Sequence, residues 1–105
     1  MFTLRLTQTA YESLGGIRDP KARREVLSSI DGLAEEPDGQ GKPLQAPLDG
    51  LRSIRATRSR YRVIYRSDPR KRRVVVLLVG ERRPGEASDV YQLAQRLVRT
   101  LLRDG

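Results

Sequence analysis

The chain has 105 residues, which fits a single domain spanning residues 1–105. Its 21 lysines and arginines exceed its 13 aspartates and glutamates, so the net charge is +8. This charge suits a phosphate-rich or acidic partner, although a solvated basic surface would look the same. Because histidine and cysteine are absent, the sequence excludes a disulfide framework, a thiolate zinc site and a histidine general base. No apolar run approaches the roughly 20 residues of a membrane span, and no signal peptide is recognisable, so we expect a cytoplasmic protein without a membrane partner.

The N-terminal half of the chain predicts one strand and two helices. Apolar and polar residues alternate over Phe2–Leu6, which predicts a half-buried strand. Thr9-Ala10-Tyr11-Glu12 has the spacing of a capping box and predicts a short helix that ends at Gly15-Gly16. Asp19-Pro20 predicts an N-cap followed by a first-turn proline, and apolar residues at helical spacing extend this second helix to about Glu35.

The C-terminal half predicts three strands and a final helix after a loop over Pro37–Gly50. The strands are expected at Leu51–Thr57, Tyr61–Arg66 and Arg73–Val79, and the third is apolar on both faces, as a strand covered on both sides would be. Ser88 is a candidate N-cap for the last helix. The apolar stripe of that helix consists of Val90, Leu93, Ala94, Leu97, Val98 and Leu101. The order β-α-α-β-β-β-α predicts an α+β fold with helices packed on a mainly antiparallel sheet.

A pair of arginines is predicted to face each other across the hairpin between the first two of these strands. If Arg58-Ser59 form a two-residue loop, Arg55 lies opposite Arg62 and both point to one face of the sheet. Such a like-charged pair costs roughly 0.2–1 kcal/mol unless an anion lies between the two guanidinium groups or they splay into solvent. The other face then consists of the core residues Ile54, Ala56, Tyr61, Val63 and Tyr65.

Further basic residues and a tyrosine follow the last strand. Arg82 and Arg83 come directly after its end, and Tyr91 lies in the first turn of the last helix. On spacing alone, Tyr91 equally suits a residue that flanks the apolar stripe. The run Arg70-Lys71-Arg72-Arg73 is expected in a solvated turn, where it would add nonspecific attraction to a nucleic acid backbone.

These motifs, in this order, resemble the RelE family of toxins, which belongs to the RelE/ParE superfamily of type II toxin–antitoxin systems. The matching stretches are Gly41-Lys42-Pro43-Leu44, Gly50-Leu51-Arg52-Ser53-Ile54-Arg55, Arg60-Tyr61-Arg62-Val63-Ile64-Tyr65-Arg66, Val79-Gly80-Glu81-Arg82 and Asp89-Val90-Tyr91. The similarity covers nearly the whole chain, and the set is specific although no single motif is diagnostic. It implies the RelE-like fold, a small sheet with two N-terminal helices and a C-terminal helix.

The resemblance also implies an activity, that of a ribosome-dependent endoribonuclease (an mRNA interferase) that cleaves mRNA in the ribosomal A site. The 2′-hydroxyl of one nucleotide attacks the adjacent phosphodiester and leaves a 2′,3′-cyclic phosphate and a 5′-hydroxyl. Carried over by position, Arg55 and Arg62 hold the phosphate, Arg82 stabilises or protonates the leaving group, and Tyr91 acts on the 2′-hydroxyl. Neither a metal ion nor another cofactor is implied, which agrees with a chain that lacks histidine.

One position departs from the family pattern. The best-known members have a second basic residue two positions before the one at Arg55, where this chain has Ser53. Arg58 at the hairpin tip is a candidate substitute, whereas Arg52 points to the opposite face by strand alternation. Arg52, Arg58 and Arg83 are the predicted RNA-binding residues outside the catalytic set.

The implied partners are a RelB-like antitoxin, the ribosome and mRNA, with operator DNA reached only through the antitoxin complex. Two alternatives stay open. One is a ParE-type inhibitor of DNA gyrase, although such proteins often have an Arg-His motif where this chain has Gly80-Glu81-Arg82-Arg83. The other is a non-catalytic basic protein that binds RNA or an antitoxin.

Overall fold

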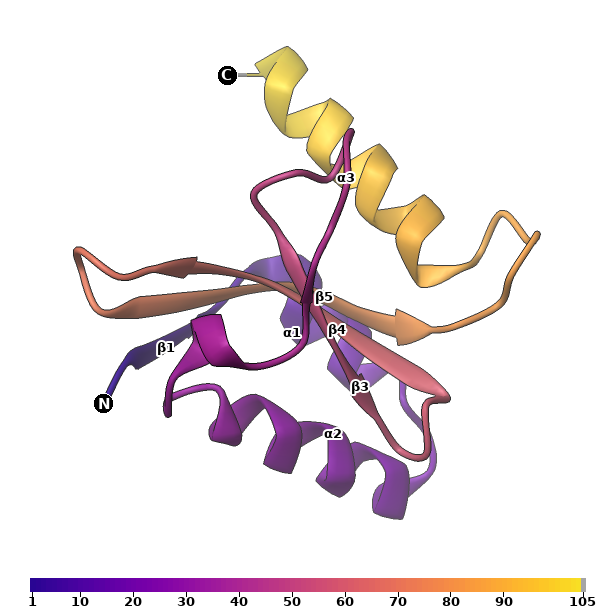
Figure 1. Ribbon diagram of the computed structural model, residues 1–105. Coiled ribbons are helices and arrows are strands. Elements are labelled where there is room, and N and C mark those ends of the chain that lie inside the picture. The colour runs from indigo at the N-terminus through magenta and orange to yellow at the C-terminus, as the bar shows by residue number, and fades with distance from the viewer. Residues whose placement is uncertain (105) are drawn as a thin grey trace.

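A five-stranded sheet separates two helical layers in the computed structural model, which describes residues 1–104 and the side chains of residues 1–100 (Figure 1). The strands are β1 (Thr3–Leu6), β2 (Lys42–Pro43), β3 (Arg52–Ala56), β4 (Tyr61–Asp68) and β5 (Arg73–Glu81). Their order in the sheet is β1-β5-β4-β3-β2; β1 is parallel to β5 and the other pairs are antiparallel. The predicted α+β fold is confirmed. No helix within this part of the chain is both long and apolar enough to cross a membrane.

The first two helices, α1 (Gln8–Gly15) and α2 (Pro20–Gly32), cover the same face of the sheet. The predicted cap of α1 at Thr9 is wrong, because the Thr7 hydroxyl accepts the Ala10 N–H at 3.0 Å and the helix starts two residues earlier. The Asp19 cap of α2 is confirmed, since its carboxylate accepts the Lys21 N–H.

Helix α2 also ends at Gly32, before the predicted Glu35. The chain turns there because the Ala34 carbonyl accepts the Phe2 N–H at 2.8 Å, which joins the exit of the helix to the start of β1. This long-range hydrogen bond has no signal in the local sequence.

The segment predicted as a loop contains a 3-10 helix (Pro37–Gly39) and the short strand β2. The Tyr65 hydroxyl bonds to the carbonyls of Pro37 at 2.8 Å and Gln40 at 2.9 Å, and Arg52 Nη2 also donates to Gln40 at 2.9 Å. Burial is the main cause of the raised pKa of Tyr65, which keeps this hydroxyl protonated. The segment is therefore fixed against β3 and β4.

The third helix, α3 (Val90–Asp104), covers the opposite face of the sheet (Figure 1). Its predicted N-cap, Ser88, is wrong; the Asp89 carboxylate accepts the Tyr91 N–H at 3.1 Å instead. Of the predicted apolar stripe, Val90 and Ala94 are buried, Leu97 and Val98 pack beside them, and Leu93 is 37% exposed, contrary to prediction. Leu101 lies outside the residues whose side chains are described.

Strand β5 has apolar contacts on both faces, as its sequence predicts. Val74, Val76 and Val79 belong to the core beneath α1 and α2, whereas Leu77 and Leu78 belong to the core beneath α3. Two consecutive residues share one face because the register shifts: Ile64 pairs with Leu78, Tyr65 pairs with Val76, and Leu77 is the extra residue. This bulge reverses the in-and-out alternation for the rest of the strand.

Candidate active site

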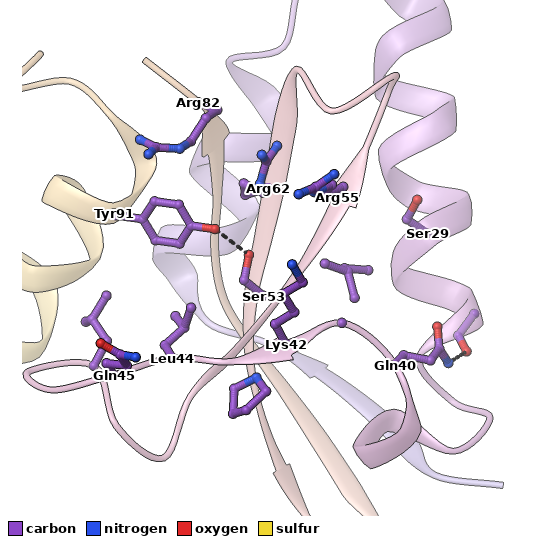
Figure 2. A pocket seen from close by; sticks show the side chains of 15 residues that line it. Ser29, Gln40, Lys42, Leu44, Gln45, Ser53, Arg55, Arg62, Arg82 and Tyr91 are labelled. Atoms are coloured by element: carbon purple, nitrogen blue, oxygen red, sulfur yellow. Dashed lines mark hydrogen bonds between the residues drawn. The ribbon is translucent and has the colours of Figure 1, made fainter. Parts of the chain in front are cut away.

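A cavity of about 1180 Å³ runs from the first turn of α3 across β3 and β4 to α2 (Figure 2). Arg55, Arg62, Arg82 and Tyr91, the four residues predicted to be catalytic, all line it. The complete lining is Ser29, Gly32, Gln40, Gly41, Lys42, Pro43, Leu44, Gln45, Leu48, Ser53, Ile54, Arg55, Arg62, Arg82 and Tyr91. Four of these side chains are cationic and none is acidic, so the cavity is suited to an anion.

The predicted arginine pair on the β3–β4 hairpin is confirmed. Arg55 pairs with Arg62, and the two flanking pairs follow the same register. Thr57, Arg58 and Ser59 have positive φ values of 54°, 53° and 70° in the connecting turn. Arg62 Nη1 donates to the Ser59 and Tyr61 carbonyls, and this contact directs the guanidinium toward the turn. Arg55 is exposed and Arg62 is half-buried, so the pair brings two positive charges within one strand spacing.

Arg82 lies over Tyr91, with its guanidinium carbon 4.9 Å from the centroid of the ring. At this distance the two groups form a cation–π contact. Arg82 Nη1 also donates to Asp89 Oδ1 at 2.6 Å, and the backbone N–H of Arg82 donates to the Arg60 carbonyl at 2.8 Å. The guanidinium is therefore held between the Asp89 carboxylate and the Tyr91 ring.

Asp89 is the buried anion that organises this end of the cavity, with only 3% of its surface exposed. Its carboxylate accepts hydrogen bonds from the Arg82 side chain and from the backbone N–H groups of Arg83 and Tyr91. Burial by itself would raise the pKa of Asp89, but these three donors outweigh it and the pKa lies below its ordinary value. Asp89 is therefore ionised and ties the end of β5 to the start of α3.

The Tyr91 hydroxyl lies 3.0 Å from Ser53 Oγ, and this contact joins α3 to β3 (Figure 2). Ser53 is buried, with 6% exposure, on the face of β3 that also presents Arg55. Helix α3 packs closely against β5 at Gly80, where a Cβ would lie 3.0 Å from a methyl group of Val90. The hydroxyl is consequently held at a defined place within the cavity.

The three predicted RNA-binding residues do not line this cavity. Arg52 points to the opposite face and is bound to the Gln40 carbonyl through Nε and Nη2. Arg58 is exposed at the hairpin tip. Arg83 is exposed and forms salt bridges with Glu81 at 3.2 Å and Glu86 at 4.0 Å. The roles of these three residues in RNA binding, including Arg58 as a substitute for a basic side chain at Ser53, stay predictions.

Three residues of this region acquired no role from the sequence alone. Asp89 appeared only as part of a motif, Lys42 lay in a predicted loop, and Ser53 was noted only for lacking a charge. Ser53 contacts Tyr91, which is 38 residues away, and Lys42 pairs with Ser53 on another strand. No local spacing in the sequence therefore identifies Ser53 or Lys42. Between residues 1 and 104, no cluster of histidine, cysteine, aspartate and glutamate is arranged to hold a metal ion.

Comparison with known proteins finds relatives that are toxins or parts of toxin–antitoxin complexes. No family model matches the chain. Toxin RelG from Mycobacterium tuberculosis is 34% identical over 91 residues, which cover 87% of this chain and 97% of RelG. The RelBE2 toxin–antitoxin complex from the same organism contains a chain that is 36% identical, with a TM-score of 0.67 over 77% of this chain and 91% of that one.

A mutant of the E. coli toxin RelE in the free state has a TM-score of 0.69, covering 92% of this chain and 97% of that one. The sequence of this mutant is 23% identical to the present chain, so the match shows a shared fold alone.

The fold, the basic cavity and these relatives define the toxin of a toxin–antitoxin system. More particularly, the chain belongs to the RelE-type toxins of the RelE/ParE superfamily.

Proposed function

We propose that this toxin is a ribosome-dependent endoribonuclease that cleaves mRNA in the A site by attack of a 2′-hydroxyl. The observation that supports this function best is the convergence of Arg55, Arg62, Arg82 and Tyr91 on one cavity without an acidic lining residue. Phosphodiester cleavage of this kind needs positive charge on the developing phosphorane and groups that handle two protons. The cavity contains both kinds of group.

Each residue has a separate part in the proposed reaction. The 2′-oxygen bonds to phosphorus, the bond to the 5′-oxygen breaks, and a 2′,3′-cyclic phosphate and a 5′-hydroxyl form. Arg55 and Arg62 bind the non-bridging oxygens, and Tyr91 acts on the proton of the 2′-hydroxyl. Arg82 stabilises the leaving oxygen or supplies its proton. No step needs a metal ion or another cofactor.

The ribosome supplies the orientation that a domain of this size lacks. Holding the 2′-oxygen, the phosphorus and the leaving oxygen in line is worth several kcal/mol of barrier, about 7–11 in the best cases. Exposed basic residues outside the cavity, such as Lys21, Arg24 and the run at residues 70–72, are suited to docking on ribosomal RNA. Arg23, in contrast, is bound to the Ile17 carbonyl at 2.7 Å and is less available.

A RelB-like antitoxin is the second proposed partner. The net charge of +8 favours an acidic segment that neutralises the toxin surface. Solved relatives include the RelBE2 complex and an E. coli RelE mutant bound to a RelB peptide. Any contact with operator DNA would then pass through the antitoxin complex. Co-expression with the product of the adjacent gene tests this partner; failure to copurify in moderate salt would contradict it.

The activity is tested by adding the purified toxin to ribosomes programmed with a defined mRNA and mapping the new 5′ ends. We expect cuts within the A-site codon that bear 5′-hydroxyl groups, and much slower cleavage of the same mRNA without ribosomes. Equal rates on naked mRNA would contradict ribosome dependence. Inhibition of DNA gyrase supercoiling without any cleavage would instead support the ParE-type alternative.

A further inference from the structure

Lys42 lies in the cavity beside the residues already assigned, although the sequence placed it in a loop. It starts the two-residue strand β2 and pairs directly with Ser53 of β3 in the antiparallel register. Directly opposed residues point to the same face of a sheet, so Lys42 and Ser53 share the cavity face. Figure 2 shows the Lys42 side chain extending toward Ser53, on the side of the cavity that also contains Arg55.

The residue before Lys42 shows that this placement is built into the backbone. Gly41 has a φ of +63°, a conformation that side chains other than glycine rarely adopt. A Cβ at this position would lie 2.3 Å from the Ser53 carbonyl oxygen and 2.7 Å from Ile54 Cγ2. Because both contacts are impossible for a real Cβ, only glycine lets β2 approach β3 closely enough to form the Lys42–Ser53 pair.

The charge of Lys42 is available to a ligand. Arg82 is already paired with Asp89, but no carboxylate among the described residues forms a salt bridge with Lys42. Its side chain is exposed, and its ammonium is a point charge on a flexible stem. A cation without a protein counter-ion, facing a cavity with three arginines, has a phosphate as its natural partner.

We propose that Lys42 is a further substrate-contacting residue, whose ammonium binds a phosphate of the RNA strand next to the Ser53–Tyr91 pair. Arg55 and Arg62 would hold the phosphate under attack, and Lys42 would fix the strand on the Ser53 side of it. This inference rests on the proposed function, because it assumes that the anion in the cavity is RNA.

The test measures binding and cleavage separately. The binding probe is a fluorescein-labelled hexauridylate with 2′-O-methyl groups, which cannot be cleaved because it lacks the nucleophile. Its affinity for the toxin is measured by anisotropy at several salt concentrations, for the wild type, Lys42→Ala, Lys42→Arg and the control Arg18→Ala. Arg18 is also exposed, but it lies before α2 and does not line the cavity.

We expect Lys42→Ala to weaken binding about 3- to 10-fold and to reduce the slope of log K against log salt by about 0.7, the value for one phosphate contact on a single strand. Lys42→Arg keeps the slope, and so does Arg18→Ala. A purely structural role for Lys42 would not change the slope, and thermal melts of each variant check that the fold is intact.

Single-turnover cleavage on programmed ribosomes separates this inference from the proposed function. A wild-type toxin that binds the probe but never cleaves contradicts the nuclease proposal, while the change in slope still supports the contact. A Lys42→Ala variant with the wild-type slope contradicts the Lys42 inference whether or not the wild type cleaves. A wild type that fails to bind the probe also contradicts it.

Discussion

Asp89 Oδ1 accepts a hydrogen bond from Arg82 Nη1 at 2.6 Å, and the same carboxylate caps the first turn of α3. The buried Asp89 carboxylate thereby sets the position of Arg82, which directly follows β5. It also sets the position of Tyr91, which lies two residues after Asp89 in the chain. The cation–π contact between Arg82 and Tyr91 completes the unit. Asp89 does not line the cavity, so it is a positioning residue for two residues that do.

Asp89→Ala should lower the free energy of unfolding by roughly 1–2 kcal/mol, the upper part of the range for losing a helix N-cap. Toxicity on induction should fall as well, because Arg82 and Tyr91 lose their common anchor. Ser88→Ala is the matched control, since Ser88 is exposed and is not the cap. Urea denaturation and growth arrest measure both effects. Equal losses in the two variants would mean that the cap has been wrongly assigned.

The lowered pKa of Asp89 predicts a pH dependence of stability. A carboxyl group whose pKa is lower in the folded state contributes stability above its unfolded pKa of about 3.9, and this contribution disappears as the pH falls through the folded pKa. The stability difference between the wild type and Asp89→Asn should therefore be constant from pH 7 to about pH 5 and shrink below pH 4. Urea midpoints measured at each pH would contradict the assignment if the difference stayed constant down to pH 2.

Tyr91→Phe should reduce cleavage by about 10²–10⁴-fold, the usual contribution of a proton-transfer group. It keeps the ring under Arg82 and removes only the hydroxyl bonded to Ser53, so stability should fall by about 1 kcal/mol. Ser53→Ala should give a smaller loss of rate, because the hydroxyl stays but loses its partner. Tyr11→Phe is the control, since Tyr11 is 63% exposed on α1. Full activity in Tyr91→Phe would remove this residue from the mechanism.

Arg62→Ala should reduce cleavage by about 10²–10³-fold, by analogy with losing one donor from a preorganised anion site. Its stability should stay within roughly 0.5 kcal/mol of the wild type, because relief of the repulsion from Arg55 offsets the lost hydrogen bonds to the turn. Arg18→Ala is the control and should keep activity, because Arg18 is exposed and does not line the cavity.

The arginine pair also predicts stabilisation by a simple anion. Sulfate should raise the melting temperature of the wild type more than that of Arg62→Ala, since a ligand that binds only the folded state stabilises it. Differential scanning fluorimetry at constant ionic strength measures this. Identical sulfate responses in the two proteins would indicate that no anion binds between Arg55 and Arg62.

Much of the site was predictable where it depends on local pattern. The two-residue loop fixed the register of the β3–β4 hairpin, and the register placed Arg55 opposite Arg62 with the core residues on the other face. The proline and aspartate at the start of α2 were equally reliable, because capping involves only neighbouring residues. The caps of α1 and α3 were misplaced because more than one polar residue precedes each helix, and tertiary contacts select between them.

The sequence by itself determined the order of the elements apart from the 3-10 helix and β2, and it also determined the arginine pair and the family. The tertiary structure decided which residues join that pair. Strand alternation from Val74 and Val76 would point Arg82 toward α1 and α2, but the bulge at Leu77 reverses the alternation and turns Arg82 toward Tyr91. Lys42 enters the cavity because β2 pairs with β3, and Gly41 permits that approach. A bulge and a close contact between strands both depend on packing between distant segments. A local pattern of residues therefore predicts neither feature.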